Sequence, residues 1–254
     1  MPMMRIVSRP SEERELLLDA VKASAVDGAV SVLEAGCGQK WTLKPEGLTL
    51  HITGVDTDAE AMRIREQKQG DLEAAIVGDL RDVDLPVGKF DVVYCSFVLE
   101  HVEGAESVLD RLLAAVRPGG RLIVRVPDGN SVFGWVARHT PHRTHVWFKR
   151  YIERFPDAGK PGHAPYPVVY DKVVSADGLQ KWAPGTGATV EQIYASNLAL
   201  MPFRRFRPVA NAAILSFAWL SRGRLTGRWN NIGIVVIPGA TGEVPAKDSA
   251  SAAQ

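Results

Sequence analysis

Short apolar runs that end on an acidic residue recur along the first half of the chain. The runs lie at residues 29–35, 48–58 and 74–79, and their acids are Glu34, Asp56 and Asp79. Segments with helical apolar spacing follow at 58–69 and 104–120. Strand patterns that alternate with helical patterns predict a parallel sheet with helices on its faces. In such sheets ligands bind beyond the carboxyl ends of the strands, so the acids mark the expected site.

The remaining patterns complete a seven-stranded sheet. Four further strands are predicted at residues 89–97, 121–127, 188–196 and 231–238. A helix is predicted over 11–25, with Ser11 as its N-cap, because a serine followed by acids is typical of helix starts. We therefore expect an α/β fold whose doubly wound, mostly parallel sheet carries helices on both faces.

Shifts in composition divide the chain into segments. We predict an N-terminal helical lead at 1–28, a ligand-binding core at 29–127, a lid insertion after the fifth strand at 128–175, the end of the core at 176–238 with a basic-aromatic insertion at 200–229, and a disordered tail at 239–254. The lid is rich in Pro, His, Trp and Tyr, whereas the tail lacks residues that form a core.

Composition narrows the class of protein. The 254 residues are 46% hydrophobic, which is ample for a core, and the formal net charge of +1 gives no global attraction to nucleic acid or membrane. Two cysteines cannot form a disulfide framework. The N-terminus has no signal-peptide pattern, and the longest apolar run, 208–220, is too short to span a bilayer. We expect a cytoplasmic protein.

The strand-end residues suit a bound nucleoside. Asp56, 22 residues after Glu34, can accept hydrogen bonds from both ribose hydroxyls. Gly36 and Gly38 let the loop backbone approach a ligand without a Cβ in the way. Asp79 can accept a hydrogen bond from an exocyclic amine such as adenine N6.

A nicotinamide dinucleotide fits this sequence less well. The pattern Gly-x-Gly-x-x-Gly requires a third glycine where the chain has Trp41. A bulky residue there opposes the helix–strand packing that positions a pyrophosphate. The Tyr-x-x-x-Lys signature of short-chain dehydrogenases is absent from the sequence. A nicotinamide-dependent oxidoreductase remains the alternative enzyme class.

Four motifs in order carry a resemblance to a known family. They are "VLEAGCG" (32–38), "GVDTDAEAM" (54–62), "GDL" (78–80) and "FDVVYCSFVLEHV" (90–102), followed by "LDRLLAAVRPGGRLIVRVP". Over about residues 30–127 the chain resembles class I S-adenosylmethionine-dependent methyltransferases of the small-molecule type. The resemblance implies a Rossmann-like fold, S-adenosyl-L-methionine as cofactor and S-adenosyl-L-homocysteine as product.

The resemblance also implies which residues hold the cofactor. The methionyl end would lie against Glu34, Ala35, Gly36, Cys37 and Gly38. The adenosine would lie against Asp56, Thr57, Gly78, Asp79 and Leu80, and the sulfonium would be bordered by Cys95 and Ser96. One position departs from the family pattern, because Lys40 stands where many members have a third glycine. Only residues 39–47 then precede the second strand, so the usual long helix is curtailed and this wall must be built differently.

Candidate catalytic and acceptor-binding residues follow the fourth strand and occupy the lid. If the acceptor is a hydroxyl, a general base near the methyl helps, and His101 is the candidate. A loop-anchoring histidine is the alternative. The candidate substrate contacts are Phe97, Glu100, Trp135, His142 and His145, with simple packing as the alternative. No metal is expected, because Pro141 disturbs the helix that would align the lid histidines.

The basic-aromatic insertion has arginines at 204, 205, 207, 222, 224 and 228 and no acid. We favour a surface helix whose apolar face packs on the sheet, leaving a solvated basic rim. Peripheral membrane contact is possible but not favoured, and no nucleic-acid partner is expected because no binding module accompanies the patch.

Together these patterns predict a methyltransferase that acts on a small or medium-sized acceptor. O-methylation of a saccharide, a secondary metabolite or a lipid-linked intermediate is the favoured reaction, because a potential base is present. A catalytically inactive, methyltransferase-like binding module is the non-enzymatic alternative. The sequence leaves the acceptor and the oligomeric state open.

Overall fold

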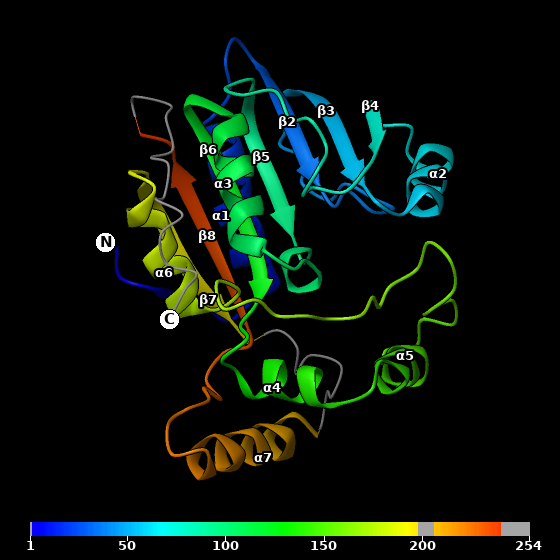
Figure 1. The fold of residues 1–254 in the computed structure, drawn as a ribbon, viewed down its shortest axis with the longest axis vertical. Coiled ribbons are helices and arrows are strands. Elements are labelled where there is room, and N and C mark those ends of the chain that lie inside the picture. The colour runs from blue at the N-terminus through cyan, green and yellow to red at the C-terminus, as the bar shows by residue number, and fades with distance from the viewer. Residues whose placement is uncertain (1, 198–205, 240–254) are drawn as a thin grey trace, which may run out of the picture.

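A computed structural model describes residues 2–197 and 206–239 and contains one mixed sheet (Figure 1). Its strands are β1 (Arg5–Val7), β2 (Ala29–Ala35), β3 (Thr49–Asp56), β4 (Leu72–Val77), β5 (Phe90–Ser96), β6 (Val116–Pro127), β7 (Thr189–Ser196) and β8 (Asn231–Ile237). They are ordered β1-β7-β8-β6-β5-β2-β3-β4. Only β8 runs antiparallel to its neighbours within this described sheet. The predicted mostly parallel α/β fold is confirmed.

All seven predicted strands are present, and β1 adds an eighth at the edge beside β7. With three residues, β1 is too short to give a periodic signal, so the predicted N-terminal helical lead contains a strand that its sequence does not indicate. β6 also begins at Val116, earlier than the predicted residue 121, because Val116 already pairs with Phe90 of β5.

Some of the helices cover the two faces of the sheet. The helices of the described residues are α1 (Pro10–Lys22), α2 (Ala59–Lys68), α3 (Ala105–Ala115), α4 (Val132–His139), α5 (His142–Tyr151), α6 (Ala176–Gly185) and α7 (Arg207–Leu220), with a short 3₁₀ turn at Leu99–His101. One core cluster joins α3 and α6 to one face, and a second joins α1 to the other (Figure 1). Side chains alternate along each strand, so every central strand contributes to both clusters.

The start of α1 differs from the prediction. Ser11 lies inside the helix, and Arg9 is the N-cap with an extended backbone. Pro10 at the first turn explains the shift, because proline favours that position and restricts the residue before it to extended conformations. The Glu12 carboxylate accepts a hydrogen bond from the backbone N–H of Ser8 at 3.1 Å, which supports the start.

The connection between β2 and β3 contains no helix, as the short spacing predicted. Trp41 and Leu43 fill the space instead, each 3% exposed. The Trp41 ring meets the Tyr94 ring edge-on with centroids 5.3 Å apart. The wall beside the glycine loop is therefore made of apolar side chains rather than a helix.

Helices α4, α5 and α7 lie beyond the carboxyl ends of the parallel strands (Figure 1). Pro141 separates α4 from α5, so the lid histidines lie on two different helices. The prediction that the basic-aromatic insertion packs on the sheet is wrong: α7 packs against α4, through rings such as Trp135 and Phe217 with centroids 5.1 Å apart. Arg204, Arg205 and the predicted tail after Gly239 lie outside the described residues.

Candidate cofactor and active site

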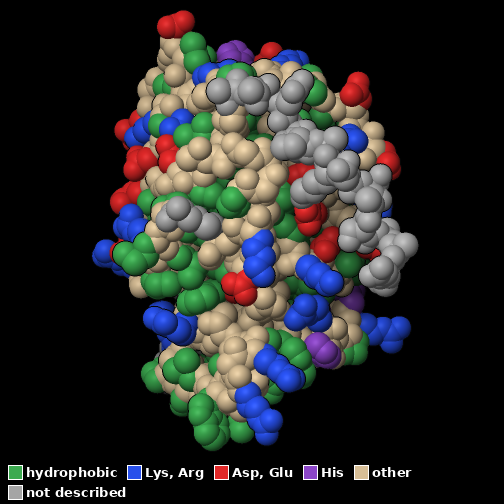
Figure 2. All heavy atoms as spheres, turned by 60° about the vertical axis from the view of Figure 1, so that its left-hand side comes forward, with side chains coloured by type: hydrophobic (Ala, Val, Ile, Leu, Met, Phe, Trp, Pro, Cys, Tyr) green, Lys and Arg blue, Asp and Glu red, His purple; other side chains and the backbone are tan. Residues whose placement is uncertain are grey.

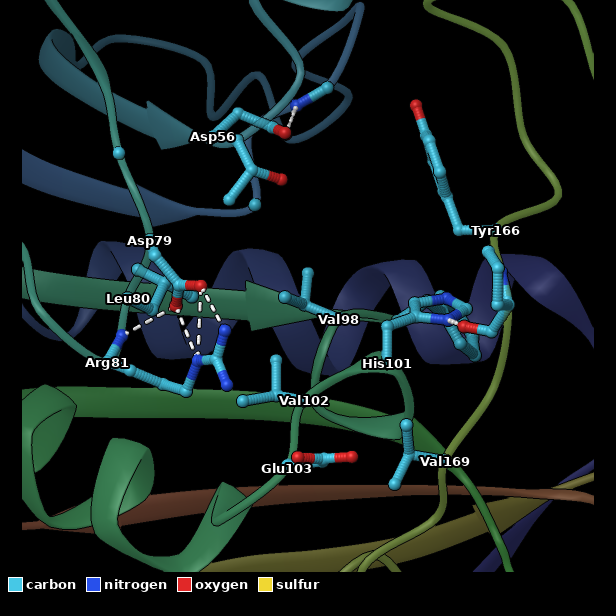
Figure 3. A pocket seen from close by; sticks show the side chains of 16 residues that line it. Asp56, Asp79, Leu80, Arg81, Val98, His101, Val102, Glu103, Tyr166 and Val169 are labelled. Atoms are coloured by element: carbon cyan, nitrogen blue, oxygen red, sulfur yellow. Dashed lines mark hydrogen bonds and ion pairs between the residues drawn. The ribbon is translucent and has the colours of Figure 1, made fainter.

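A cavity of about 570 Å³ opens where the winding of the sheet reverses (Figure 3). β2 lies between β3 and β5. From β2 the chain adds β3 and β4 on one side, and it then crosses back to add β5 and β6 on the other side. Loops after β2 and β5 therefore separate and leave a crevice, which is the usual ligand site of such sheets. The lining residues include Gly36, Gly38, Asp56, Thr57, Gly78, Asp79, Leu80, Phe97 and His101.

The glycine loop is anchored from below by a buried ion network. Arg65 of α2 is fully buried, and its Nη1 lies 2.5 Å from Glu34 Oε2 and 2.9 Å from the Cys37 carbonyl oxygen. Its Nε and Nη2 donate to Asp71 at 2.9 and 3.1 Å. Burial raises the pKa of Glu34 to about 8, although the Arg65 guanidinium acts in the opposite direction. No sequence motif indicates a role for Arg65 at this site.

Asp56 fixes the same loop from the side. One carboxylate oxygen accepts the Gly38 N–H at 2.8 Å, and the other accepts the Asp58 N–H at 2.8 Å. Each carboxylate oxygen has two lone pairs, so both retain capacity for a ribose hydroxyl. Asp56 faces the cavity together with Thr57, in line with the expected ribose position.

Asp79 occupies the far end of the cavity and forms an ion pair that the sequence reasoning missed. Its Oδ2 lies 2.7 Å from Nη2 of Arg81, and it also accepts the Arg81 backbone N–H at 2.9 Å. These hydrogen bonds lower the pKa of Asp79, which keeps it ionised. Arg81 lines the cavity as well, so two charged groups face the expected adenine position (Figure 3).

Glycine suits the two loop positions, 36 and 38, for different structural reasons. A Cβ on Gly36, whose φ is +71°, would lie 2.1 Å from a methyl carbon of Val98. Gly38 has φ +52° and nothing within 4 Å of its virtual Cβ. The open space at Gly38 belongs to the cavity, so a ligand can approach the backbone there. This cradle, with the two strand-end acids, fits the methionyl and adenosyl parts of S-adenosylmethionine.

Several residues assigned to the cofactor contribute backbone or packing rather than a cavity-facing side chain. Ala35 and Cys95 are fully buried in the core, so the Cys95 side chain does not border the cavity as expected. Burial raises the pKa of both cysteine thiols, that of Cys37 to about 12. Ser96 faces a neighbouring cavity, where its Oγ accepts a hydrogen bond from Arg125 at 3.2 Å.

His101 lies on the cavity wall and ties down the lid. Its Nδ1 is 2.6 Å from the Pro167 carbonyl oxygen, and its ring meets Tyr166 edge-on with centroids 6.0 Å apart (Figure 3). Because a carbonyl oxygen only accepts, Nδ1 carries the proton and Nε2 of the neutral ring holds a free lone pair. Burial lowers the pKa of His101, so this neutral form is favoured.

Glu100 is buried beside His101 rather than exposed to an acceptor. It is 4% exposed, its Oε2 has no hydrogen-bond partner, and its Oε1 lies 3.8 Å from His101 Nε2. Burial raises the pKa of Glu100 to about 8. Glu100 is therefore a buried neighbour of His101 and lines neither the cofactor cavity nor the cavity beside it.

A second cavity of about 760 Å³ adjoins the first. The two share Gly36, Gly38, Phe97 and Tyr166. Its lining carries the ammonium groups of Lys40, Lys68 and Lys149, together with Arg125, which is paired with Glu13 at 3.0 Å. The acids that line it, Glu34 and Asp157, are paired with Arg65 and Lys160. The second cavity is therefore electropositive.

The predicted lid contacts lie away from both cavities. Trp135 stacks on His139 with centroids 4.3 Å apart, and His145 Nε2 is hydrogen-bonded to Thr140 Oγ1 at 2.7 Å. His142 and His145 face each other with centroids 6.1 Å apart. These three predicted residues, Trp135, His142 and His145, pack the lid, whereas Phe97 lines both cavities as expected. In residues 2–197 and 206–239 no three metal-ligating side chains form a cluster.

Comparison with known proteins is consistent with this geometry. A family described as "Methyltransferase domain" matches residues 33–124. The ubiquinone biosynthesis O-methyltransferase of Marinobacter nauticus is 28% identical over 156 residues, covering 52% of this chain and 64% of that protein. The human thiol S-methyltransferase TMT1B is 28% identical over 148 residues, covering 54% of this chain and 60% of that protein. The matches therefore span less than two thirds of either relative.

Among solved structures, a geranyl diphosphate methyltransferase in complex with S-adenosylmethionine superposes with a TM-score of 0.55. It is 14% identical, and the match covers 89% of this chain and 84% of that one. At this identity the likeness concerns the fold. The fold is that of class I, S-adenosylmethionine-dependent methyltransferases, and the cavity lies where such folds bind their ligand. The chain carries the methyltransferase domain of that class at residues 33–124.

Proposed function

We propose that the protein transfers a methyl group from S-adenosylmethionine to a hydroxyl of a small or medium-sized acceptor. The observation that carries the proposal is the cavity at the reversal of the sheet, where Asp56, Asp79 and the open backbone at Gly38 face one space. Within it, Asp56 takes the ribose hydroxyls, Asp79 and the Leu80 backbone take the adenine edge, and Gly36 and Gly38 adjoin the methionyl end.

The acceptor enters through the second cavity and meets the methyl at the shared wall of Phe97 and Tyr166. Bound S-adenosylmethionine supplies a methyl group already activated by its positive sulfur. Orientation by the cavity walls then provides most of the rate enhancement. The electropositive lining of the second cavity favours an acceptor that carries a negative charge.

His101 serves as the general base in this proposal. Its Nδ1–H donates to the Pro167 carbonyl oxygen, which holds the ring in one orientation and leaves Nε2 as the proton acceptor. The lowered pKa keeps the ring neutral at pH 7, so no prior deprotonation is needed. The proton released by the acceptor hydroxyl then resides on Nε2.

Calorimetric titration tests the cofactor assignment. S-adenosylhomocysteine should bind with micromolar affinity, and NADH and NADPH should not bind. Asp56→Ala should weaken S-adenosylhomocysteine binding by about 1–3 kcal/mol, the scale for losing a charged hydrogen-bond partner. Absence of S-adenosylhomocysteine binding by folded protein would instead favour an inactive binding module, and selective NADH binding would favour an oxidoreductase.

A screen of acceptors with methyl-labelled S-adenosylmethionine then tests the reaction. Hydroxylated acceptors with an acidic group should accept label in preference to their neutral analogues. Label found only on amines or thiols would overturn the O-methylation assignment while leaving the cofactor assignment intact.

A further inference from the structure

Helix α7 is apolar but has no buried residue. Between Arg207 and Arg222 it carries no charged side chain. Its aromatic and aliphatic side chains point outwards, with Trp219 79%, Val209 69% and Leu220 68% exposed. A helix that is apolar on most sides is normally covered by something, so an exposed one indicates a contact surface.

The layer that contains α7 is also free of acidic residues. Residues 129–152, which include α4 and α5, and residues 206–229, which include α7, hold eight of the chain's 30 Lys and Arg and none of its 29 Asp and Glu. Because the chain's net charge is +1, the remaining residues carry a formal charge of −7. Positive charge is therefore concentrated in this layer.

The two acid-free stretches are joined into one body. The Trp135 ring of α4 contacts the Phe217 ring of α7. The backbone N–H groups of Val132 and Thr226 donate to Thr226 and Asn130 carbonyl oxygens at 3.0 and 2.9 Å. Figure 2 shows hydrophobic side chains with Lys and Arg between them at this lower end of the molecule. We call residues 129–152 together with 206–229 the basal layer.

A lipid surface fits the basal layer better than a second copy of the chain does. A two-fold dimer through this layer would oppose two positively charged, acid-free faces, which repel each other. An anionic membrane complements both the cations and the exposed apolar side chains of the layer. Its phosphate headgroups pair with Arg and Lys, while Trp and Leu side chains enter the boundary of the acyl chains. No helix among the described residues is long and apolar enough to cross a membrane, so α7 would lie in the plane of the surface.

We propose that the basal layer docks on anionic lipid membranes, with α7 lying in the interface. Trp219, Val209 and Leu220 insert between lipids, and Arg207, Arg222 and Arg224 contact headgroups. The parallel strands point with their carboxyl ends towards this layer (Figure 1), and the cofactor cavity is lined by residues at those ends. Docking would therefore bring the membrane to the end of the sheet at which the acceptor binds.

Vesicle co-sedimentation of the full chain tests the proposal. Vesicles of phosphatidylcholine with about one third phosphatidylglycerol should pellet the protein, and added salt should release it because exposed charges are screened. Pure phosphatidylcholine vesicles should bind at least tenfold more weakly. Equal binding to both vesicles would overturn the headgroup assignment, and no binding to either would overturn the proposal.

Matched variants locate the contact. Trp219→Ser/Leu220→Ser and Arg222→Glu/Arg224→Glu should each weaken binding at least tenfold. Val87→Ser, a 74% exposed valine outside the basal layer, should leave it unchanged. Unchanged binding by both double variants would overturn the assignment to α7. Sedimentation velocity that showed a dimer dependent on Trp219, or tighter binding to DNA than to vesicles, would replace lipid with that partner.

The assay separates this inference from the proposed methyl transfer. None of the substituted residues lines the cofactor cavity, so every variant should bind S-adenosylhomocysteine as wild type does. Loss of vesicle binding with intact cofactor binding supports the membrane surface alone. Loss of both in a double variant would indicate general misfolding, and the single variants Val209→Ser and Arg224→Gln, which perturb the fold less, would then decide.

Discussion

Arg65 supports the cofactor site without appearing in any of its motifs. In the sequence it lies among charged residues of α2 and looks like a solvated position, yet its side chain is fully buried. A buried guanidinium is tolerated only with full pairing, which Glu34, Asp71 and the Cys37 carbonyl oxygen provide. These partners converge only in the folded chain, so local pattern could predict the strand-end acid but not its counter-ion.

His101 has two separable roles, and two substitutions distinguish them. His101→Ala removes both the hydrogen bond to the Pro167 carbonyl oxygen and the free Nε2. His101→Asn retains a donor near the Nδ1 position and loses the base. If His101 is the base, both variants should lower turnover about 10²–10⁴-fold, while S-adenosylhomocysteine affinity in His101→Asn stays near wild type.

The pH profile provides a second readout for His101. Its lowered pKa means that the neutral ring persists below the ordinary pKa of histidine, so activity should fall only as pH drops through that lowered value. The acid limb should disappear in His101→Asn. Wild-type turnover in His101→Asn, with reduced turnover in His101→Ala, would make His101 an anchor only.

The two loop glycines should respond differently to alanine. Gly36→Ala places a Cβ against Val98 at 2.1 Å and imposes a positive φ, so we expect destabilisation on the order of 2–4 kcal/mol. Gly38→Ala meets no atom within 4 Å, so its cost is the φ strain of about 1 kcal/mol. Thermal unfolding compares the two. S-adenosylhomocysteine titration of Gly38→Ala should show weaker binding, because its methyl group occupies the cofactor space.

At the level of elements, the strands were more predictable than the segments that join them. Strand patterns at 29–35 and 89–97 agree with β2 and β5 to within a residue, because both are central strands with nearly continuous apolar burial. For the lid, the sequence indicated the residue composition but not the orientation of the helices. Its helices α4 and α5 are separated at Pro141 as predicted, yet their histidines pack among themselves because nothing in local spacing specifies which face meets the cavity.

The segment between α5 and α6 is held over the cavity by a contact that can be tested directly. Tyr166 Oη donates to Asp58 Oδ2 at 2.8 Å, and Asp58 is also the N-cap of α2. Tyr166→Phe removes this link and should cost about 0.5–1.5 kcal/mol of stability. Release of this segment should raise the Kd for S-adenosylhomocysteine and speed tryptic cleavage after Arg154, which lies in the same segment. Tyr151→Phe, on an exposed side chain of α5, is the control and should change neither.

At the scale of the whole molecule, positive charge is concentrated in the basal layer. Residues 129–152 and 206–229 hold no Asp or Glu, so their cations are unbalanced, and every acid lies elsewhere in the chain. The acid-free insertion was predicted from the sequence, but its apolar helix was expected to pack on the sheet. Local sequence patterns do not indicate that α3 and α6 already cover one face of the sheet.

Global stability should depend on pH through Glu100. Its pKa is raised by burial from 4.5 to about 8, so its folding contribution is complete below pH 4.5 and is lost progressively as pH rises towards 8. Glu100→Gln cannot ionise and avoids this loss. The stability of Glu100→Gln relative to wild type should therefore increase by about 1–3 kcal/mol between pH 6 and pH 8.

Urea unfolding of both proteins at several pH values measures this difference. Glu34, whose pKa is also raised to about 8, is present in both proteins, so its effect cancels in the comparison. The lowered pKa of the neighbouring His101 affects stability on the acid side, which the chosen pH range largely avoids. Glu103→Gln, at an exposed position on the same cavity, should show no such trend. If the difference in unfolding free energy between Glu100→Gln and wild type does not change with pH, Glu100 is ionised in the folded protein. A polar group must then reach its Oε2.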